Sequence, residues 1–106
     1  MKIRIADNEL RFRIDPQDLL LLKEKKELNT TISISHNVTF HCILSLRDDL
    51  EQPLISMSDF KLHLHLPSVE TSQWLKSDKE ITLYKNLLLA NSPTVLTVEK
   101  DLPCKH

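Results

Sequence analysis

Apolar and polar residues alternate strictly along Val38–Leu46, where every second side chain is apolar and Ile43 is the one exception. A period of two is typical of a strand that has one face on a hydrophobic core. This is the longest such run in the chain, so it predicts a central strand. Cys42 falls on the apolar side of the run, which favours a buried and unreactive thiol.

The same alternation predicts a hairpin at the start of the chain. Lys2–Ala6 and Glu9–Ile14 both alternate, and Asp7-Asn8 between them tolerates the positive φ angles of a tight turn. Because the chain contains no glycine, we expect Asn and Asp to supply the turns that need a positive φ. His36-Asn37 is predicted to be a second two-residue turn.

Similar patterns predict the remaining elements. Two short helices are expected, one that opens at Asp15-Pro16 and ends within Lys23–Glu27, and one over Pro67–Leu75. Val69 and Trp74 are expected on the buried face of the second helix, with Trp74 as a core anchor. Further strands are predicted over Leu28–Ser35, Pro53–Met57, Phe60–Leu66, Glu80–Lys85 and Thr94–Lys100. In the strand over Phe60–Leu66, Phe60 is expected to face the core.

The connections between these strands are mostly short, which favours antiparallel pairing. About eight strands and two short helices give an α+β, β-rich class without an apparent internal repeat. An amphipathic sheet of this size must curl or cover its apolar face. We therefore predict a strongly bent, mainly antiparallel sheet or a partly open barrel, in a single domain over residues 1–106 with a tail at about 101–106.

Composition narrows the possible functions mainly by what it leaves out. With 14 basic and 15 acidic residues the net charge is -1, which provides no general attraction to nucleic acid or to a membrane. Without glycine there is neither a Walker A loop nor a dinucleotide-binding loop, and no cofactor is expected. Two cysteines, no apolar leader after Met1 and no long apolar run favour a cytoplasmic protein.

Both ends of the chain resemble a known family. The opening Met1–Ile5, followed by Asn8 and Leu10–Arg13, is similar to the start of a small bacterial family without established activity. The closing segment Val98–Leu102, followed by Cys104, is similar to the end of the same family. The resemblance implies one intact domain and carries over no catalytic residue.

Four basic side chains, which we call the basic stripe, are predicted on the outer face of the first hairpin: Lys2, Arg4, Arg11 and Arg13. Cross-strand neighbours in such a hairpin lie roughly 5–8 Å apart, and guanidinium groups suit phosphate and carboxylate. One hypothesis is an anion site, in a binding protein or in an enzyme that acts on a phosphorylated or carboxylated ligand. The alternative is a salt-bridge network with Glu99 and Asp101, if the first and last strands are neighbours.

A second candidate site consists of imidazole groups. His63 and His65 are two residues apart on a predicted strand and point the same way, as two metal ligands on a strand do. His41 and the tail, which contains Cys104 and His106, offer further ligands for such a metal-binding protein. No spacing matches a zinc finger or a metalloprotease helix, so solvent-facing histidines are the alternative.

The sequence leaves the function unknown, because no set of residues matches a known nucleophilic centre. The few aromatic residues (one Trp, one Tyr and three Phe) give no strong nucleic-acid signal. Our hypothesis is a non-enzymatic interaction domain that binds a protein partner or a second copy of itself through an exposed strand edge.

Overall fold

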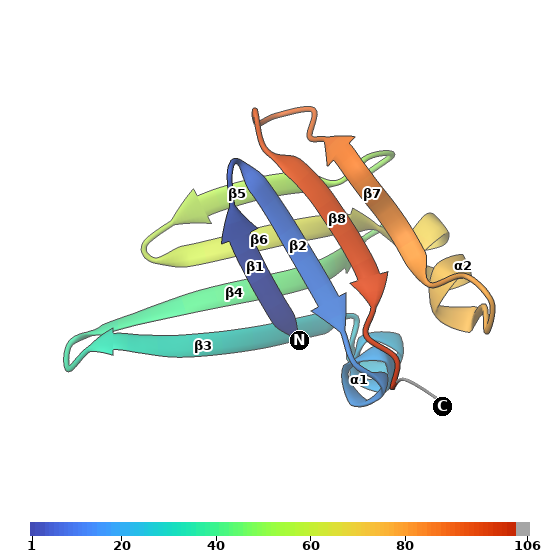
Figure 1. Cartoon of the computed structure of the whole chain (residues 1–106), viewed down its shortest axis with the longest axis horizontal. Helices are drawn as coiled ribbons and strands as arrows, with labels where there is room; N and C mark the ends of the chain where they lie inside the picture. Colours follow the sequence, from blue (N-terminus) through green and yellow to red (C-terminus); the bar gives the residue numbers. More distant parts are fainter. Residues whose placement is uncertain (104–106) are drawn as a thin grey trace.

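Eight strands and two helices form two four-stranded sheets in the computed structural model, which describes residues 1–103 (Figure 1). The elements are β1 (Lys2–Ala6), β2 (Glu9–Ile14), α1 (Pro16–Lys25), β3 (Glu27–Ser35), β4 (Val38–Arg47), β5 (Leu54–Ser58), β6 (Lys61–Pro67), α2 (Ser68–Lys76), β7 (Thr82–Leu88) and β8 (Val95–Lys100). The predicted α+β class, with eight strands and two short helices, is confirmed.

The strands divide between two sheets, whereas the sequence favoured one bent sheet. The first sheet has the order β1-β2-β8-β7 and the second has the order β3-β4-β6-β5, so neither closes into a barrel. Four strand pairs are antiparallel, but β2 pairs with β8, and β4 with β6, in parallel. In each sheet, two antiparallel hairpins lie side by side, and the parallel pair is formed where they meet. The two strands of a parallel pair are therefore not joined directly by a crossover connection.

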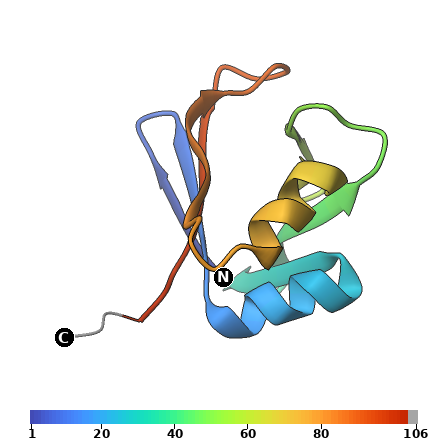
Figure 2. The same cartoon turned by 90° about the vertical axis from the view of Figure 1, so that its right-hand side faces the viewer.

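One hydrophobic core draws on both sheets and both helices. Alternate residues of the inner strands face it, and Phe12, Leu44 and Leu64 are fully buried. Trp74 of α2 is 1% exposed, and its Nε1 donates to the carbonyl oxygen of Ile81 at 3.1 Å, which confirms its role as a core anchor. Figure 2 shows the two sheets as separate layers that splay apart, with both helices on one side.

Positive φ angles occur at six described residues, none of them glycine. Four are Asp or Asn, as predicted, but Lys26 and Phe60 adopt them too. Phe60 belongs to the turn before β6, and its side chain is 59% exposed. The prediction that Phe60 faces the core is therefore wrong. Val69 is also exposed, because α2 turns the face that carries Trp74 and Leu75 toward the core.

The two halves of the chain repeat one arrangement, although the sequence showed no repeat. Each half is a hairpin, a helix and a second hairpin, and exchanging the halves converts the strand order of one sheet into that of the other. The hairpins over residues 2–14 and 54–66 pair in the same register, with equivalent residues 52 positions apart. Both turn through two residues of positive φ, Asp7-Asn8 and Asp59-Phe60. Each residue can therefore be compared with its equivalent in the other half.

Candidate functional site

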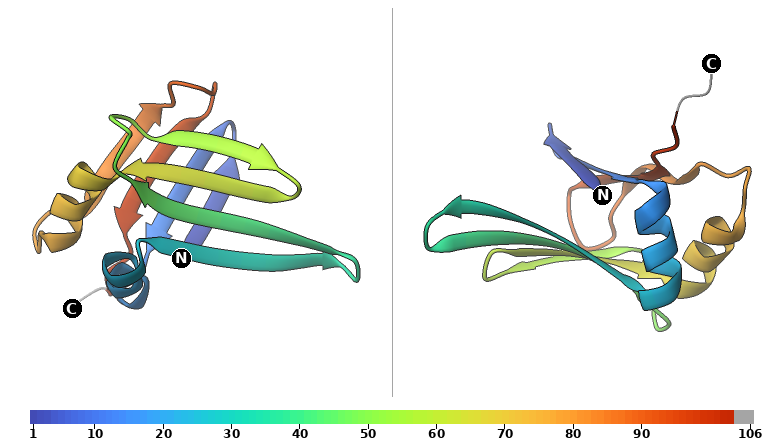
Figure 3. Two further views of the ribbon diagram at one scale, coloured as in Figure 1. Left: turned by 180° about the vertical axis from the view of Figure 1, so that it is seen from behind. Right: turned by 90° about the horizontal axis from the view of Figure 1, so that it is seen from below.

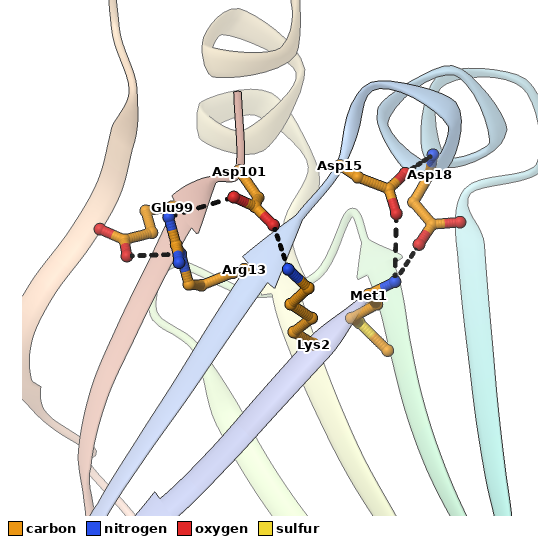
Figure 4. A network of polar contacts seen from close by, with 7 residues as sticks. All are labelled: Met1, Lys2, Arg13, Asp15, Asp18, Glu99 and Asp101. Carbon is orange, nitrogen blue, oxygen red and sulfur yellow. Dashed lines mark hydrogen bonds and ion pairs between the residues drawn. The ribbon is translucent and has the colours of Figure 1, made fainter. Parts of the chain in front are cut away.

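The basic stripe lies on the outer face of the first sheet, where two carboxylates hold three of its four cations. Arg11 Nη2 donates to Glu99 Oε1 at 2.6 Å, and Arg13 Nε lies 3.2 Å from the same oxygen. Asp101 carries oxygens 3.1 Å from Arg13 Nη2 and 3.2 Å from Lys2 Nζ (Figure 4). These contacts match the salt-bridge alternative, and they form because β2 and β8 are neighbours.

Arg4 is the exception in the basic stripe. Within residues 1–103 it forms no ion pair. It lies directly across from Arg11 in the hairpin and lines two depressions of about 190 and 200 Å³ on this face. A hydrogen bond from Lys2 and the positive charge of Arg13 hold the pKa of Asp101 below its usual range. Within the described residues the stripe thus combines three paired cations with one that forms no ion pair.

A second ionic cluster lies at the start of the same hairpin (Figure 4). The α-amino group of Met1 contacts the carboxylate of Asp18 and lies 3.7 Å from Asp15. Asp15 is also the N-cap of α1, because its carboxylate accepts a hydrogen bond from the backbone N–H of Asp18 at 2.9 Å. Negative charge is favourable at this end of a helix. The cluster fastens β1 to α1.

His63 and His65 lie on the outer face of β6 in the second sheet, where their side chains cross. His63 Nε2 and the Ser45 hydroxyl on β4 form a hydrogen bond of 2.5 Å, whereas His65 Nε2 lies 3.5 Å from the Ser56 hydroxyl on β5. The rings stack with their centroids 3.9 Å apart. The two Nε2 atoms therefore point toward opposite neighbouring strands and do not converge on one point.

Burial favours the neutral form of both imidazoles. It lowers the pKa of His63 below its ordinary value, and the charge of Arg47 acts in the same direction. Burial also lowers the pKa of His65, with further contributions from His63 and Arg47. Because only the neutral ring offers a lone pair to a metal, the protonation state itself does not oppose metal binding.

The other predicted metal ligands do not complete this site. Within residues 1–103, no group of three His, Cys, Asp or Glu residues lies close enough together to hold a metal ion, so His41 does not join the pair. Cys104 and His106 lie outside the described residues. Cys42 is buried, and burial raises the pKa of its thiol, as expected for an unreactive cysteine. A metal at the histidine pair stays a prediction.

The two predicted sites occupy equivalent positions in the two halves. Arg11 of β2 is equivalent to His63 of β6, and Glu99 of β8 is equivalent to Ser45 of β4. The salt bridge in the first sheet and the hydrogen bond in the second sheet are therefore the same contact made by different side chains. Sequence reasoning missed Ser45, because its equivalence to Glu99, 54 positions farther along the chain, follows from the strand pairing and not from a repeat visible in the sequence.

Ser45 and His63 are hydrogen-bonded to each other, as a nucleophile and its base are. Catalytic triads also need a third group that orients the base. Among the residues that the structure describes, His63 has no hydrogen-bonding partner other than Ser45. Within residues 1–103 the pair therefore lacks the third group of a triad.

The two sheets leave four edge strands, and three of the edges carry features that oppose pairing with another strand. β1 carries the charged side chains of Lys2 and Arg4. β7 contains two register shifts and Lys85. On β5, the Asn91 side chain accepts a hydrogen bond from the backbone N–H of Ile55 at 3.3 Å and donates to its carbonyl oxygen at 2.7 Å. These three edges are charged, irregular or covered.

β3 is different from the other three edges. It is nine residues long, and its residues from Asn29 to Ser35 are all exposed and uncharged. Ile32 and Ile34 are 57% and 65% exposed, and the one register shift lies at the far end of the strand. The β3–β4 hairpin projects at the end of the molecule away from both helices (Figure 3). A long, uncharged, exposed edge is a template for another strand.

Comparison with known proteins defines the family of the chain but not its activity. No curated protein and no solved structure shows significant similarity to it. None of the helices in residues 1–103 has the length and apolar character needed to cross a membrane. The model of one family matches residues 1–106, in agreement with the resemblance of both chain ends to an uncharacterised family. The chain therefore belongs to the family of unknown function DUF7009.

Proposed function

We propose that this protein is a non-enzymatic interaction domain of the cytoplasm, which pairs with another strand through the free edge of β3. The observation that carries the proposal is the contrast among the four edges. The edges of β1, β5 and β7 carry charges, a covering side chain or irregular pairing, whereas β3 offers an uncharged and uncovered edge. Strand addition at such an edge gains main-chain hydrogen bonds with little reorganisation.

A second copy of the chain is the partner that this edge fits best. Antiparallel pairing of two β3 strands about Ile32 places Thr31 opposite Ser33, and Thr30 opposite Ile34, of the other copy. No charges meet along Asn29–Ser35. On one side Ile32 faces its own copy with Ile34 beside Thr30, and on the other side only hydroxyl and amide groups meet. Such self-complementarity is what a two-fold symmetric interface requires.

Analytical ultracentrifugation of the purified protein tests this proposal. Ile32→Lys places two ammonium groups at the two-fold axis of the proposed dimer, and the fold should survive because Ile32 is exposed in the single chain. Leu88→Lys on the edge strand β7, where Leu88 is 64% exposed, is the matched control. We expect dimers of the native protein and of the control, and a folded monomer for Ile32→Lys. A native protein that stays monomeric up to about 1 mM overturns the proposal.

Arg4 favours a second candidate function, anion binding on the outer face of the first sheet. An anion held beside Arg4 would neutralise its charge and reduce its repulsion with Arg11 directly opposite, which shares Glu99 with Arg13. We expect pyrophosphate to raise the melting temperature more than sodium chloride at equal ionic strength. Arg4→Gln should remove the difference, and Lys85→Gln on β7 should keep it. The absence of a difference in the native protein rules out this function.

A further inference from the structure

Lys100 at the end of β8 is a buried cation without a counter-ion in the described structure. It is 7% exposed, its Nζ donates to the carbonyl oxygen of Ser77 at 2.5 Å, and the same atom lies 5.2 Å from the centre of the Trp74 ring. Within residues 1–103, no carboxylate lies within ion-pair distance of it. Because buried ammonium groups are normally paired with a carboxylate, the charge of Lys100 is balanced less completely than is usual.

The two halves differ at the position of this lysine. The parallel pairs place Lys100 beside Ile14 and its equivalent, Leu46, beside Leu66. The same position in the first half is thus filled by an apolar side chain that packs against the core. The ammonium group is therefore a specific feature of the second half, one that costs stability unless something compensates its charge.

A cleft of about 330 Å³ opens beside Lys100, between α1, the end of α2 and the segment after β8. Its apolar wall consists of Pro16 and four leucines, of which Leu20 and Leu102 are exposed: Leu19, Leu20, Leu75 and Leu102. The charged groups of its lining are Lys23, Lys100 and Asp78. An apolar wall with a few polar groups is typical of a small-molecule site.

We propose that this cleft binds an aliphatic monocarboxylate, with the carboxylate on Lys100 and the hydrocarbon chain against the four leucines. Two cations and one carboxylate line the cleft, and a single negative charge on the ligand balances the difference. Burial lowers the pKa of Lys100, against the effect of Asp78 and Glu80, and a bound anion counteracts this loss of charge. The cleft is independent of the β3 edge, so neither proposal depends on the other.

Trp74 provides a direct test, because it is the one tryptophan of the chain and its ring contacts Lys100. Octanoate is titrated into the native protein while the fluorescence emission of Trp74 is recorded, with acetate and 1-octanol as comparison ligands. We expect a saturable change with octanoate, none with acetate, and binding of 1-octanol weaker by about tenfold because it lacks the charge. Unchanged emission with octanoate overturns the proposal.

Lys100→Met keeps an apolar side chain of similar length and removes the ammonium group. We expect it to bind octanoate at least about tenfold more weakly than the native protein, whereas Lys76→Met at an exposed position outside the cleft binds normally. Leu20→Asp adds a negative charge at an exposed wall residue, so it should fold and also lose binding. Equal binding by either folded cleft variant and the native protein overturns the proposal.

Discussion

The hairpins β1–β2 and β5–β6 show what the shared architecture fixes and what it leaves free. The inner positions of β2 and β6 are all apolar and buried, with three residues of β2 matched by three of β6: Leu10, Phe12 and Ile14 by Leu62, Leu64 and Leu66. Their outer positions differ, because two arginines of β2 are replaced by two histidines in β6. Inner residues must fill one close-packed core, whereas outer residues are constrained only by their neighbours on the sheet surface. The differences that carry function should therefore lie on the outer faces and edges.

The largest expected effect comes from truncating equivalent inner residues. Phe12→Ala and Leu64→Ala should lower the free energy of unfolding by about 4 and about 3 kcal/mol, because both side chains are fully buried and leave cavities. Urea unfolding of both variants measures these losses. A loss below about 1 kcal/mol for only one of them would show that the two halves do not share the core equally.

A smaller loss of stability is expected from breaking the equivalent contacts of the two halves, the Arg11–Glu99 salt bridge and the His63–Ser45 hydrogen bond. Glu99→Gln should cost about 1 kcal/mol, since the arginines that it pairs with are partly exposed and screened by solvent. Ser45→Ala removes a hydrogen bond to His63 and should also cost about 1 kcal/mol.

The dependence of these two costs on ionic strength distinguishes the ionic contact from the neutral one. Raising the ionic strength from about 0.05 to about 1 M should reduce the cost of Glu99→Gln, because exposed ion pairs are screened over a few ångströms at high salt. The cost of Ser45→Ala should not change. Urea unfolding at the two ionic strengths measures both costs, and an equal response to salt contradicts the assignment of one contact as ionic and the other as neutral.

Local features of the fold could be predicted from the sequence because they depend on neighbouring residues. The bounds of β1 and β2 and the capping of α1 by Asp15 follow from alternation and from N-cap chemistry. Alternation states which residues share a face, but not which strands share a sheet. The division into two sheets was missed for that reason, since the parallel pairing of β2 with β8 joins the two ends of the chain.

The candidate site shows the same limit. The sequence offered Glu99 and Asp101 as partners of the basic stripe only if the first and last strands were neighbours, and the structure pairs them with Lys2, Arg11 and Arg13. Arg4 was expected in that network but lies opposite Arg11, whose neighbour on β8 is Thr97, whereas Lys2 on the same strand lies opposite Arg13, at the end of β8 that carries Glu99 and leads to Asp101. The cleft at Lys100 could not be foreseen, because it needs three segments that only tertiary packing brings together.

A further difference between the halves is their response to pH. The pKa values of His63 and His65 are lowered in the folded protein, so the unfolded chain binds protons more readily and stability falls as the pH drops below about 6.5. Urea unfolding between about pH 7.5 and 5 should show this fall. A double variant, His63→Asn with His65→Asn, should lose most of it, and an unchanged slope would mean that other groups titrate.

The smallest expected effect is a change in the affinity of His63 and His65 for a metal ion. It shows whether Ser45 and Ser56 compete with the metal for the imidazoles or position them for it. To chelate one ion, both Nε2 atoms must leave Ser45 and Ser56, which lie on opposite sides of β6. The double variant Ser45→Ala with Ser56→Ala frees both rings, so it should bind Ni²⁺ more tightly than the native protein by about threefold, the equivalent of one weak hydrogen bond. Isothermal titration calorimetry measures the change, with His63→Asn as the control that removes a ligand. Weaker binding by the serine variant would mean that the hydroxyl groups position the imidazoles for the metal.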